Sequence, residues 1–296
     1  MRRTAGNMIR NAIIEMERHN IPEAEVSARL IMSHTVGQRQ FVDDNHVMTS
    51  EQIVRFRDLI ENRVENRTPV QYLLGEWDFH NLTGLKMKSP VLIPRPETEQ
   101  LVEFAIEVAD SSNRRRVLDP CAGSGAIGLA LLRHFPDATC LACDINKDAV
   151  DLARHNASLM GLSSRYKCVE SCVSKLVEKN DKFDLLVCNP PYIFTSDMSS
   201  LAPEVFDHED HVALDGGEDG YDVVRLVLSS AKKMLQPGAQ ILLELDSKHP
   251  EHFESWLEEE EFKTAGFSNN SKLKFVEWRR DFSSLPRFVR LEYIYS

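Results

Sequence analysis

The chain has 296 residues, 42% of them hydrophobic and 27% charged, which is enough for one large domain and a smaller one. No apolar run approaches the roughly 18 to 20 residues of a membrane-spanning helix, so the sequence excludes a transmembrane protein. The formal net charge of −11 opposes broad binding to a phosphate backbone, which requires a basic surface.

Residues 1–74 predict a small all-helical domain. Apolar side chains within residues 8–16 recur at helical spacing and indicate a first helix. Pro22 suits the first turn of a second helix that ends at Gly37. A capping box that starts at Thr49 opens a third helix.

This helical part contains no group of residues that could carry a reaction, so we expect it to dock a partner. Its first fourteen residues include Arg2, Arg3 and Arg10 and no acidic residue, a composition also found in organelle-targeting segments. The same residues fit a first helix, and both interpretations stay open.

Residues 75–93 predict a β-hairpin linker between the helical part and the rest of the chain. Thr83 and Gly84 give the turn signal between two short apolar strands.

Residues 94–296 alternate between strands and helices, which predicts an α/β domain with a Rossmann-like parallel sheet and helices on both faces. Seven strands are expected, and the last two are close enough to pair in antiparallel fashion. The strands are expected at residues 117–119, 139–144, 166–169, 183–188, 239–245, 274–278 and 288–293.

The cysteines of the chain predict buried, reduced thiols, because most of them lie in apolar, strand-like runs. Cys140 and Cys143 have CxxC spacing, but an odd offset in a strand turns them to opposite faces. No second pair with zinc-like spacing follows, so we expect no metal site.

The loop after the first strand, Asp119 to Gly125, reads DPCAGSG. Its two glycines let the backbone approach a ligand at a helix N-terminus, the usual place for a nucleotide-like cofactor, although a tight structural turn uses glycines in the same way. Asp144 ends the next strand 19 residues after Gly125 and can accept hydrogen bonds from ribose hydroxyls. Asn146 is better placed to cap the following helix, so ribose binding is the favoured role of Asp144.

The segment Asn189-Pro190-Pro191-Tyr192 follows the strand FDLLVC at its carboxyl end, where the active sites of such sheets lie. The Asn189 side-chain oxygen and the Pro190 carbonyl can each accept one N–H of a substrate NH2 group, and Tyr192 can offer its ring to a flat group. This pattern favours methyl transfer to an amide or amine nitrogen, with a loop made rigid by its prolines as the structural alternative. The chain contains no GxSxG motif and no P-loop, which excludes the corresponding hydrolases and NTPases.

At these residues the whole chain resembles the class I S-adenosylmethionine-dependent methyltransferases, and specifically the HemK/PrmC-type release factor glutamine N5-methyltransferases. The RPETE segment from Arg95 is similar to the family's segment before the first catalytic-domain helix. Glu209 with ALDGGEDG at residues 213–220 is similar to the family's loop after the active site.

The resemblance implies a monomer that transfers a methyl group from S-adenosylmethionine to the glutamine of the Gly-Gly-Gln motif of class I peptide chain release factors. It implies that residues 1–74 help to hold the factor, and no metal, membrane or direct nucleic-acid partner. The implied catalytic residues are Asn189, Pro190 and Tyr192. The implied cofactor-binding residues are Cys121, Ala122, Gly123, Ser124, Gly125, Asp144, Val173 and Asn189. The implied substrate-binding residues are Asn189, Pro190, Pro191, Tyr192, Arg95 and Glu97.

The family form with a helical domain occurs in bacteria and in mitochondria. The basic start and the cysteines favour a mitochondrial location, whereas a bacterial chain would be cytoplasmic.

The chain departs from the family pattern at several positions. Cys121 stands where a glycine is usual, Cys172 where an aspartate is usual, and Asp210 where a proline usually follows the glutamate. The segment Leu245-Asp246-Ser247 also lacks a common glycine.

Two other functions stay open. An adenine-N6 nucleic-acid methyltransferase also uses the NPPY segment, although an acidic chain suits a protein partner better. The altered residues Cys121 and Cys172 also fit a pseudoenzyme that binds release factors or ribosomes without turnover.

Overall fold

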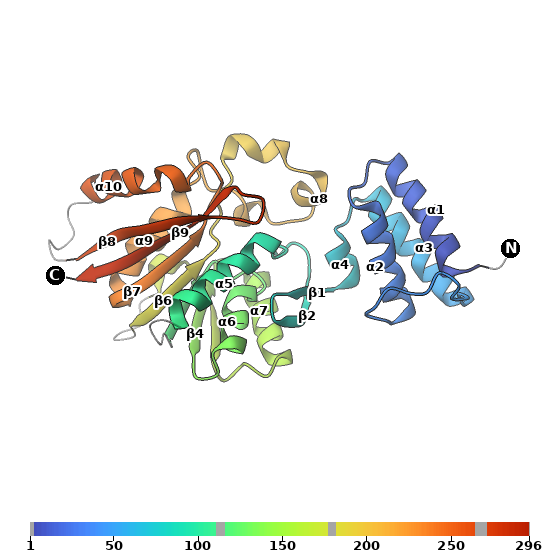
Figure 1. Cartoon of the computed structure of the whole chain (residues 1–296), viewed down its shortest axis with the longest axis horizontal. Helices are drawn as coiled ribbons and strands as arrows, with labels where there is room; N and C mark the ends of the chain where they lie inside the picture. Colours follow the sequence, from blue (N-terminus) through green and yellow to red (C-terminus); the bar gives the residue numbers. More distant parts are fainter. Residues whose placement is uncertain (1–2, 111–115, 177–181, 264–270, 296) are drawn as a thin grey trace. The chain divides into compact units, whose positions relative to one another are not determined.

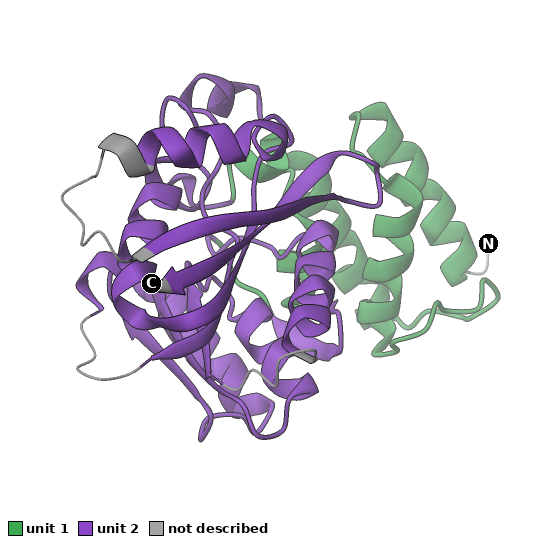
Figure 2. Ribbon diagram, turned by 60° about the vertical axis from the view of Figure 1, so that its left-hand side comes forward, with its two compact units in different colours: residues 1–77, 87–89, 202–208 green, residues 78–86, 90–201, 209–296 purple. Residues whose placement is uncertain are grey.

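The computed structural model describes residues 3–110, 116–176, 182–263 and 271–295. The chain forms two compact units (Figure 2). Unit 1 consists of Met1–Trp77, Met87–Ser89 and Ala202–His208. Unit 2 consists of Asp78–Lys86, Pro90–Leu201 and Glu209–Ser296.

Unit 1 is helical, as the sequence predicted (Figure 1). The predicted capping box is confirmed, because the Thr49 hydroxyl accepts from the Gln52 backbone N–H at 3.2 Å and the Gln52 side chain accepts from Thr49 N at 3.0 Å. Gly37 ends the second helix in the left-handed conformation, at φ 78°. The helices are α1 (Ala5–Arg18), α2 (Ala24–Val36), α3 (Ser50–Glu65), α4 (Val70–Leu74) and the short α8 (Pro203–Phe206).

The predicted place of Pro22 in the first turn of the second helix is wrong. Helix α2 starts at Ala24, and Glu23 before it has a φ of 53°, which is not a helical conformation. Pro22 therefore lies in the turn that precedes the helix.

The segment 202–208 joins unit 1 through a buried ion pair. The Glu204 carboxylate lies 3.0 Å from Nη1 of Arg63 and 2.9 Å from Nη2 of Arg67. The Arg63 and Glu204 side chains are only 5% and 12% exposed. Residues 202–208, which follow NPPY in the sequence, are thus fixed to Arg63 in α3 and to Arg67 just after that helix.

The predicted hairpin is present, but its turn is not at Thr83 and Gly84. Strands β1 (Glu76–Phe79) and β2 (Leu82–Lys86) are joined by His80 and Asn81, and His80 takes the positive φ of 50°. Gly84 lies inside β2, where its N–H donates to the Asp78 side chain at 2.7 Å. The glycine signal therefore marked a kink in a strand and not the turn.

Unit 2 is built on a seven-stranded mixed sheet with the order β5-β4-β3-β6-β7-β9-β8. Strands β3 to β7 are parallel to one another in the sheet. β9 pairs antiparallel with β8, as predicted, and it also pairs antiparallel with β7. The strands are β3 (Arg116–Pro120), β4 (Thr139–Asp144), β5 (Tyr166–Glu170), β6 (Phe183–Cys188), β7 (Leu235–Glu244), β8 (Ser271–Arg280) and β9 (Pro286–Tyr295).

Helices cover both faces of this sheet (Figure 1). One face carries α5 (Pro96–Asp110), α6 (Ala126–His134) and α7 (Lys147–Leu159), and the other carries α9 (Asp222–Met234) and α10 (Phe253–Lys263). The central strands are mostly apolar because both faces of the sheet are buried. Within the described ranges no helix has both the length and the hydropathy to cross a membrane.

Candidate active site

The candidate site lies where the parallel strands of unit 2 end. β3 has β4 on one side and β6 on the other, so the loops after β3 and β6 diverge at this point of the sheet. Open α/β sheets bind ligands in the crevice that this change of direction creates. The loop after β3, Asp144 at the end of β4 and the NPPY segment after β6 all start here.

A cavity of about 580 Å³ opens at this place, within the size range of small-molecule sites. Cys121, Gly123, Asp144, Val173 and Asn189, which the sequence assigned to cofactor binding, line it together. Its further walls include Ile145, Cys172, Pro191, Asp210, Val212 and Leu226.

The glycine-containing loop is held from behind by fixed hydrogen bonds. Ala122 N donates to the Cys143 carbonyl at 3.0 Å, and Gly125 N donates to the Ala122 carbonyl at 2.8 Å. Ala122 and Ser124 are buried, and neither they nor Gly125 line the cavity. The fully buried Asn156 donates to the Ser124 carbonyl at 2.9 Å, which ties the loop to α7. Ala122, Ser124 and Gly125 therefore lie behind the cavity wall and hold the loop that forms it.

Asp144 faces the cavity with both carboxylate oxygens already engaged. Its Oδ2 accepts from Gly123 N and its Oδ1 from Asn146 N, each at 2.9 Å. Burial raises the pKa of Asp144 despite these two bonds. Each oxygen keeps a further lone pair for a ligand hydroxyl. Asn146 caps α7, accepting from Asp148 N at 2.8 Å, so Asp144 is not needed as a cap, as predicted.

Asp119 is a second acid at the same end of the sheet, and it is fully buried. Its Oδ2 accepts from Gly128 N at 3.0 Å, while Oδ1 has no hydrogen-bond partner within the described part of the chain. Burial raises the pKa of Asp119 to about 7.

The NPPY segment presents Asn189 and Pro191 to the cavity. Pro190 is buried, and the Tyr192 hydroxyl turns away to donate to Oε1 of Glu244 at 3.3 Å. The Asn189 side chain donates from Nδ2 to the Thr98 hydroxyl at 3.2 Å, which leaves its carbonyl oxygen as the free end of the amide. The acceptor role predicted for Asn189 fits this orientation.

The ALDGGEDG loop packs against NPPY and also lines the cavity with Ala213, Asp215, Gly217 and Glu218. Ile193 N donates to the Leu214 carbonyl at 2.9 Å, and Gly216 N donates to the Ile193 carbonyl at 2.8 Å. Ile193 and Asp215 thereby form an isolated parallel bridge. This bridge holds the loop against the residue that follows NPPY.

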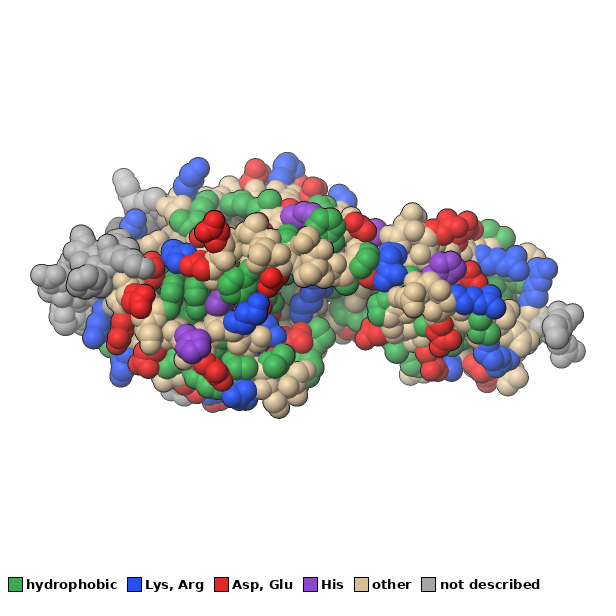
Figure 3. Space-filling view, turned by 90° about the horizontal axis from the view of Figure 1, so that it is seen from above, with side chains coloured by type: hydrophobic (Ala, Val, Ile, Leu, Met, Phe, Trp, Pro, Cys, Tyr) green, Lys and Arg blue, Asp and Glu red, His purple; other side chains and the backbone are tan. Residues whose placement is uncertain are grey.

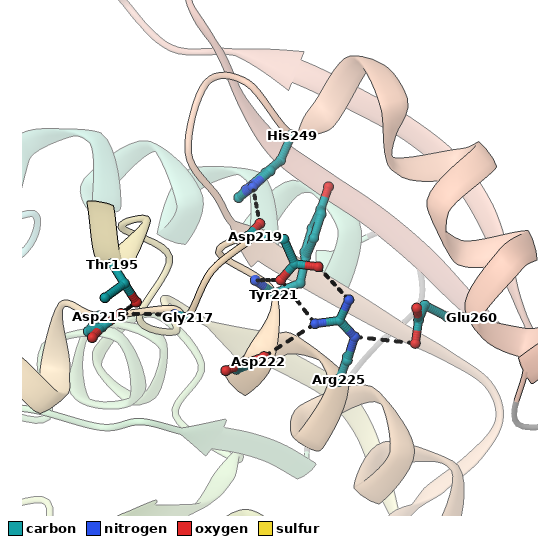
Figure 4. Close-up of polar contacts among 9 residues, drawn as sticks. All are labelled: Thr195, Asp215, Gly217, Asp219, Tyr221, Asp222, Arg225, His249 and Glu260. Carbon is teal, nitrogen blue, oxygen red and sulfur yellow. Dashed lines mark hydrogen bonds and ion pairs between the residues drawn. The ribbon is translucent and has the colours of Figure 1, made fainter. Parts of the chain in front are cut away.

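The side chains of the ALDGGEDG loop fix its own shape (Figure 4). Asp215 accepts from the Thr195 hydroxyl at 2.7 Å and from Gly217 N at 2.9 Å. Asp219 accepts from Arg225 Nη2 at 2.6 Å, and its carbonyl lies 2.9 Å from Nε2 of His249 (Figure 4). The loop is therefore rigid on both sides of its glycines.

The RPETE residues Arg95 and Glu97 do not line the cavity. Arg95 pairs with Glu209 at 2.7 Å, and Glu209 is only 4% exposed. Their role in substrate binding stays a prediction.

Comparison with known proteins extends along both units. Residues 7–75 match the family described as PrmC N-terminal domain, and residues 99–274 match the methyltransferase small domain. The human MTRF1L release factor glutamine methyltransferase is 37% identical over 293 residues, covering 93% of this chain and 83% of that protein. The release factor glutamine methyltransferase of Deinococcus radiodurans is 35% identical and covers 96% of both chains.

The chain belongs to the release factor glutamine methyltransferase family.

Three of the four departures from this family's pattern, Cys121, Cys172 and Asp210, fall on the cavity wall. Cys121 has a φ of 61°, a left-handed conformation that favours the glycine usual there and costs a side chain roughly 1 to 2 kcal/mol. Cys172 lines the cavity with its Sγ 3.1 Å from the Ser174 hydroxyl. Asp210 accepts from Asn146 Nδ2 at 2.6 Å and from Val212 N at 3.0 Å, so it caps the short 3-10 turn in place of proline.

Sequence reasoning missed several residues of this release factor glutamine methyltransferase site. Thr98 and Glu244 form hydrogen bonds with Asn189 and Tyr192 of the NPPY segment, and Val212 and Leu226 form apolar walls. An acid at the end of a predicted strand was a usable signal for Glu244. The apolar walls gave no signal, because their residues are separated by loops of no regular pattern.

Proposed function

We propose that this chain transfers a methyl group from S-adenosylmethionine to the side-chain amide nitrogen of the glutamine in the Gly-Gly-Gln motif of class I peptide chain release factors. The observation that carries the proposal is that Asp144 and Asn189, from two different strand ends, line one cavity of about 580 Å³.

The residues of the cavity fit the proposed cofactor. Asp144 suits ribose hydroxyls, because its carboxylate faces the cavity and retains acceptor capacity. Ile145, Val173, Val212 and Leu226 offer apolar walls for a flat base. When bound, S-adenosylmethionine supplies an electrophilic methyl group on a sulfonium centre.

The chain's own residues position the acceptor. The Asn189 carbonyl oxygen and the Pro190 backbone carbonyl accept the two N–H groups of the glutamine amide, which directs its nitrogen to the methyl group. An amide nitrogen is a weak nucleophile, so orientation and electrostatics carry most of the rate enhancement. The nitrogen releases its proton after transfer, so no strong base is needed.

The helical part, residues 1–74, is assigned to docking of the release factor, and residues 94–296 to catalysis. The match of residues 7–75 to the PrmC N-terminal domain supports a separate role for the helical part.

A nucleic-acid substrate is the less favoured acceptor. On the face shown in Figure 3, acidic and basic side chains are interspersed, without the continuous basic stripe that a phosphate backbone needs. The net charge of −11 points the same way.

The test is mass spectrometry of a bacterial-type class I release factor after incubation with this protein and S-adenosylmethionine, with a Gly-Gly-Ala variant as control. A single methyl mass gain confined to the Gly-Gly-Gln glutamine supports the proposal. If the release factor gains no mass although calorimetry shows cofactor binding, the methyl acceptor should be sought among ribosomal proteins and then nucleic acids. No cofactor binding at all would support a pseudoenzyme.

A further inference from the structure

Three side chains behind Asn189 come from distant parts of the chain. Thr98 lies in the first turn of α5, Tyr192 in the NPPY segment and Glu244 at the end of β7. Cys188 and Leu243 are partners in the sheet register, so Asn189, the first residue after β6, follows beside Glu244, the last residue of β7. The fold therefore brings the carboxylate directly behind the catalytic segment.

The contacts connect Asn189 to Glu244 through Thr98. Asn189 Nδ2 donates to the Thr98 hydroxyl at 3.2 Å, and the Thr98 hydroxyl interacts with the Glu244 carboxylate and lowers its pKa. Oε2 of Glu244 has no hydrogen-bond partner among the described residues. The Tyr192 hydroxyl approaches Oε1 of the same carboxylate at 3.3 Å. Glu244 is 1% exposed and Thr98 is 2% exposed, so water does not compete with these contacts.

The charge of Glu244 decides in which direction the neighbouring hydroxyl groups donate their protons. An ionised carboxylate only accepts hydrogen bonds, so the hydroxyl protons of Thr98 and Tyr192 both point to Glu244. The Thr98 oxygen is then left as an acceptor, which only the NH2 side of the Asn189 amide can satisfy. The opposite orientation of the amide would set the Asn189 carbonyl oxygen against the lone pairs of Thr98.

We propose that Thr98 and Glu244 are positioning residues that hold the Asn189 amide with its carbonyl oxygen toward the acceptor glutamine. The inference rests on the proposed function, because an asparagine that faced the glutamine with its own NH2 group could not accept the glutamine N–H. Neither residue touches substrate in this assignment, and both act through Asn189.

Protonation of Glu244 reverses the direction of these hydrogen bonds. A protonated carboxyl donates to Thr98, whose own proton then points to Asn189 and favours the wrong orientation of the amide. The charged and titratable groups that face Glu244 are Tyr192, Arg287 on β9 and Glu97 at the start of α5. Burial raises the pKa of Glu244 to about 7, against the opposing influence of Thr98 and Arg287, so reversal falls within the working pH range.

The first experiment removes the Thr98 hydroxyl. Thr98→Val is expected to lower kcat by about 10-fold to 100-fold while the S-adenosylmethionine Kd stays within about 3-fold, because a misplaced acceptor costs rate and not cofactor contacts. Thr98→Ser restores the hydroxyl and should recover most of kcat. Ser230→Ala is the matched control, since it removes another buried hydroxyl, on α9 of unit 2 and outside the cavity lining.

Three results would overturn the assignment: an unchanged kcat in Thr98→Val, a Thr98→Ser variant as impaired as Thr98→Val, or equal losses in Thr98→Val and Ser230→Ala. If Thr98→Val fails to fold, Glu244→Gln carries the test through the pH profile. Wild-type kcat should fall on the acid side of about pH 7, and Glu244→Gln should be slow with that acid-side fall removed. An acid-side fall of equal size in both proteins contradicts a role for Glu244.

A readout that needs no methyl transfer separates this inference from the proposed function. Nuclear Overhauser contacts between the Asn189 side-chain amide protons and the Thr98 γ-methyl group are expected in the wild type and should weaken in Glu244→Gln. Their presence without methylation of a release factor would refute the proposed function and leave the orientation intact. Methylation without these contacts would refute the orientation alone.

Discussion

A β-carbon on Gly220 would lie 2.7 Å from the carbonyl oxygen of Tyr192, closer than two such atoms approach in proteins. The same atom would lie 2.5 Å from Cε1 of His249. The ALDGGEDG loop therefore packs its backbone against the last residue of NPPY, and the glycine is required by space as well as by its φ of 72°.

Gly220→Ala is expected to lower kcat by about 10-fold, because it displaces the backbone that carries Tyr192. The matched control is Gly161→Ala, which has a φ of 69° but no atom within 4 Å of its β-carbon. Both variants carry the left-handed strain of roughly 1 to 2 kcal/mol, and only one carries the clash. Steady-state kinetics of both variants test this, and equal activities would mean that the loop yields without moving NPPY.

Asn189→Ala is expected to reduce kcat by at least about 100-fold, as removal of a preorganised polar group does in other active sites. The cofactor Kd measured by calorimetry should stay within about 3-fold, because Asn189 is one of many residues on the cavity wall. A parallel loss of binding and turnover would instead place Asn189 chiefly in cofactor binding.

Asp119 links stability to pH. Its folded-state pKa of about 7 lies above the ordinary value of 3.8, so between these values the folded protein holds a proton that the unfolded chain has lost. The free energy of unfolding therefore falls as pH rises through this window. Asp119→Asn removes the effect, and its stability relative to wild type should improve from pH 4 to pH 8 by up to about 4 kcal/mol. Urea unfolding at both pH values measures this, and a constant difference would show that Asp119 does not bind the proton.

Glu204→Ala should destabilise the protein by about 3 kcal/mol, because it leaves the buried guanidinium of Arg63 without its carboxylate. Glu25→Ala is the control: Glu25 and Arg29 are also 3.0 Å apart, but their side chains are 64% and 31% exposed. That exposed pair should contribute less than about 1 kcal/mol. Equal unfolding midpoints for the two variants would show that water reaches the Glu204 pair.

The strands and the ligand-facing loops could be predicted because each has a local signal. Buried parallel strands appear as apolar runs, and DPCAGSG, Asp144 and NPPY stand directly at the ends of such runs. The hairpin turn could not be placed, because Gly84 has a φ of 71° within a strand while His80 makes the turn at 50°. A glycine marks an unusual backbone conformation and does not say which kind.

The Thr98 and Glu244 contacts could not be predicted for a different reason. They depend on the register that sets Cys188 beside Leu243, and on the position of α5 over the ends of β6 and β7. Register is a property of two strands together, and neither strand alone encodes the offset. The same holds for Glu204, because no sequence pattern around it or around Arg63 and Arg67 predicts that they pair.

The order of the sheet also constrains how the protein can be made. β8 precedes β9 in the chain, yet β9 lies between β7 and β8. Until β9 has been synthesised, β7 has an unpaired edge and β8 has no place in the sheet. An exposed edge of this kind can pair with another chain. Glu244 pairs with Phe288 of β9, so the neighbour of the NPPY segment gains this partner only when the last strand of the sheet is in place.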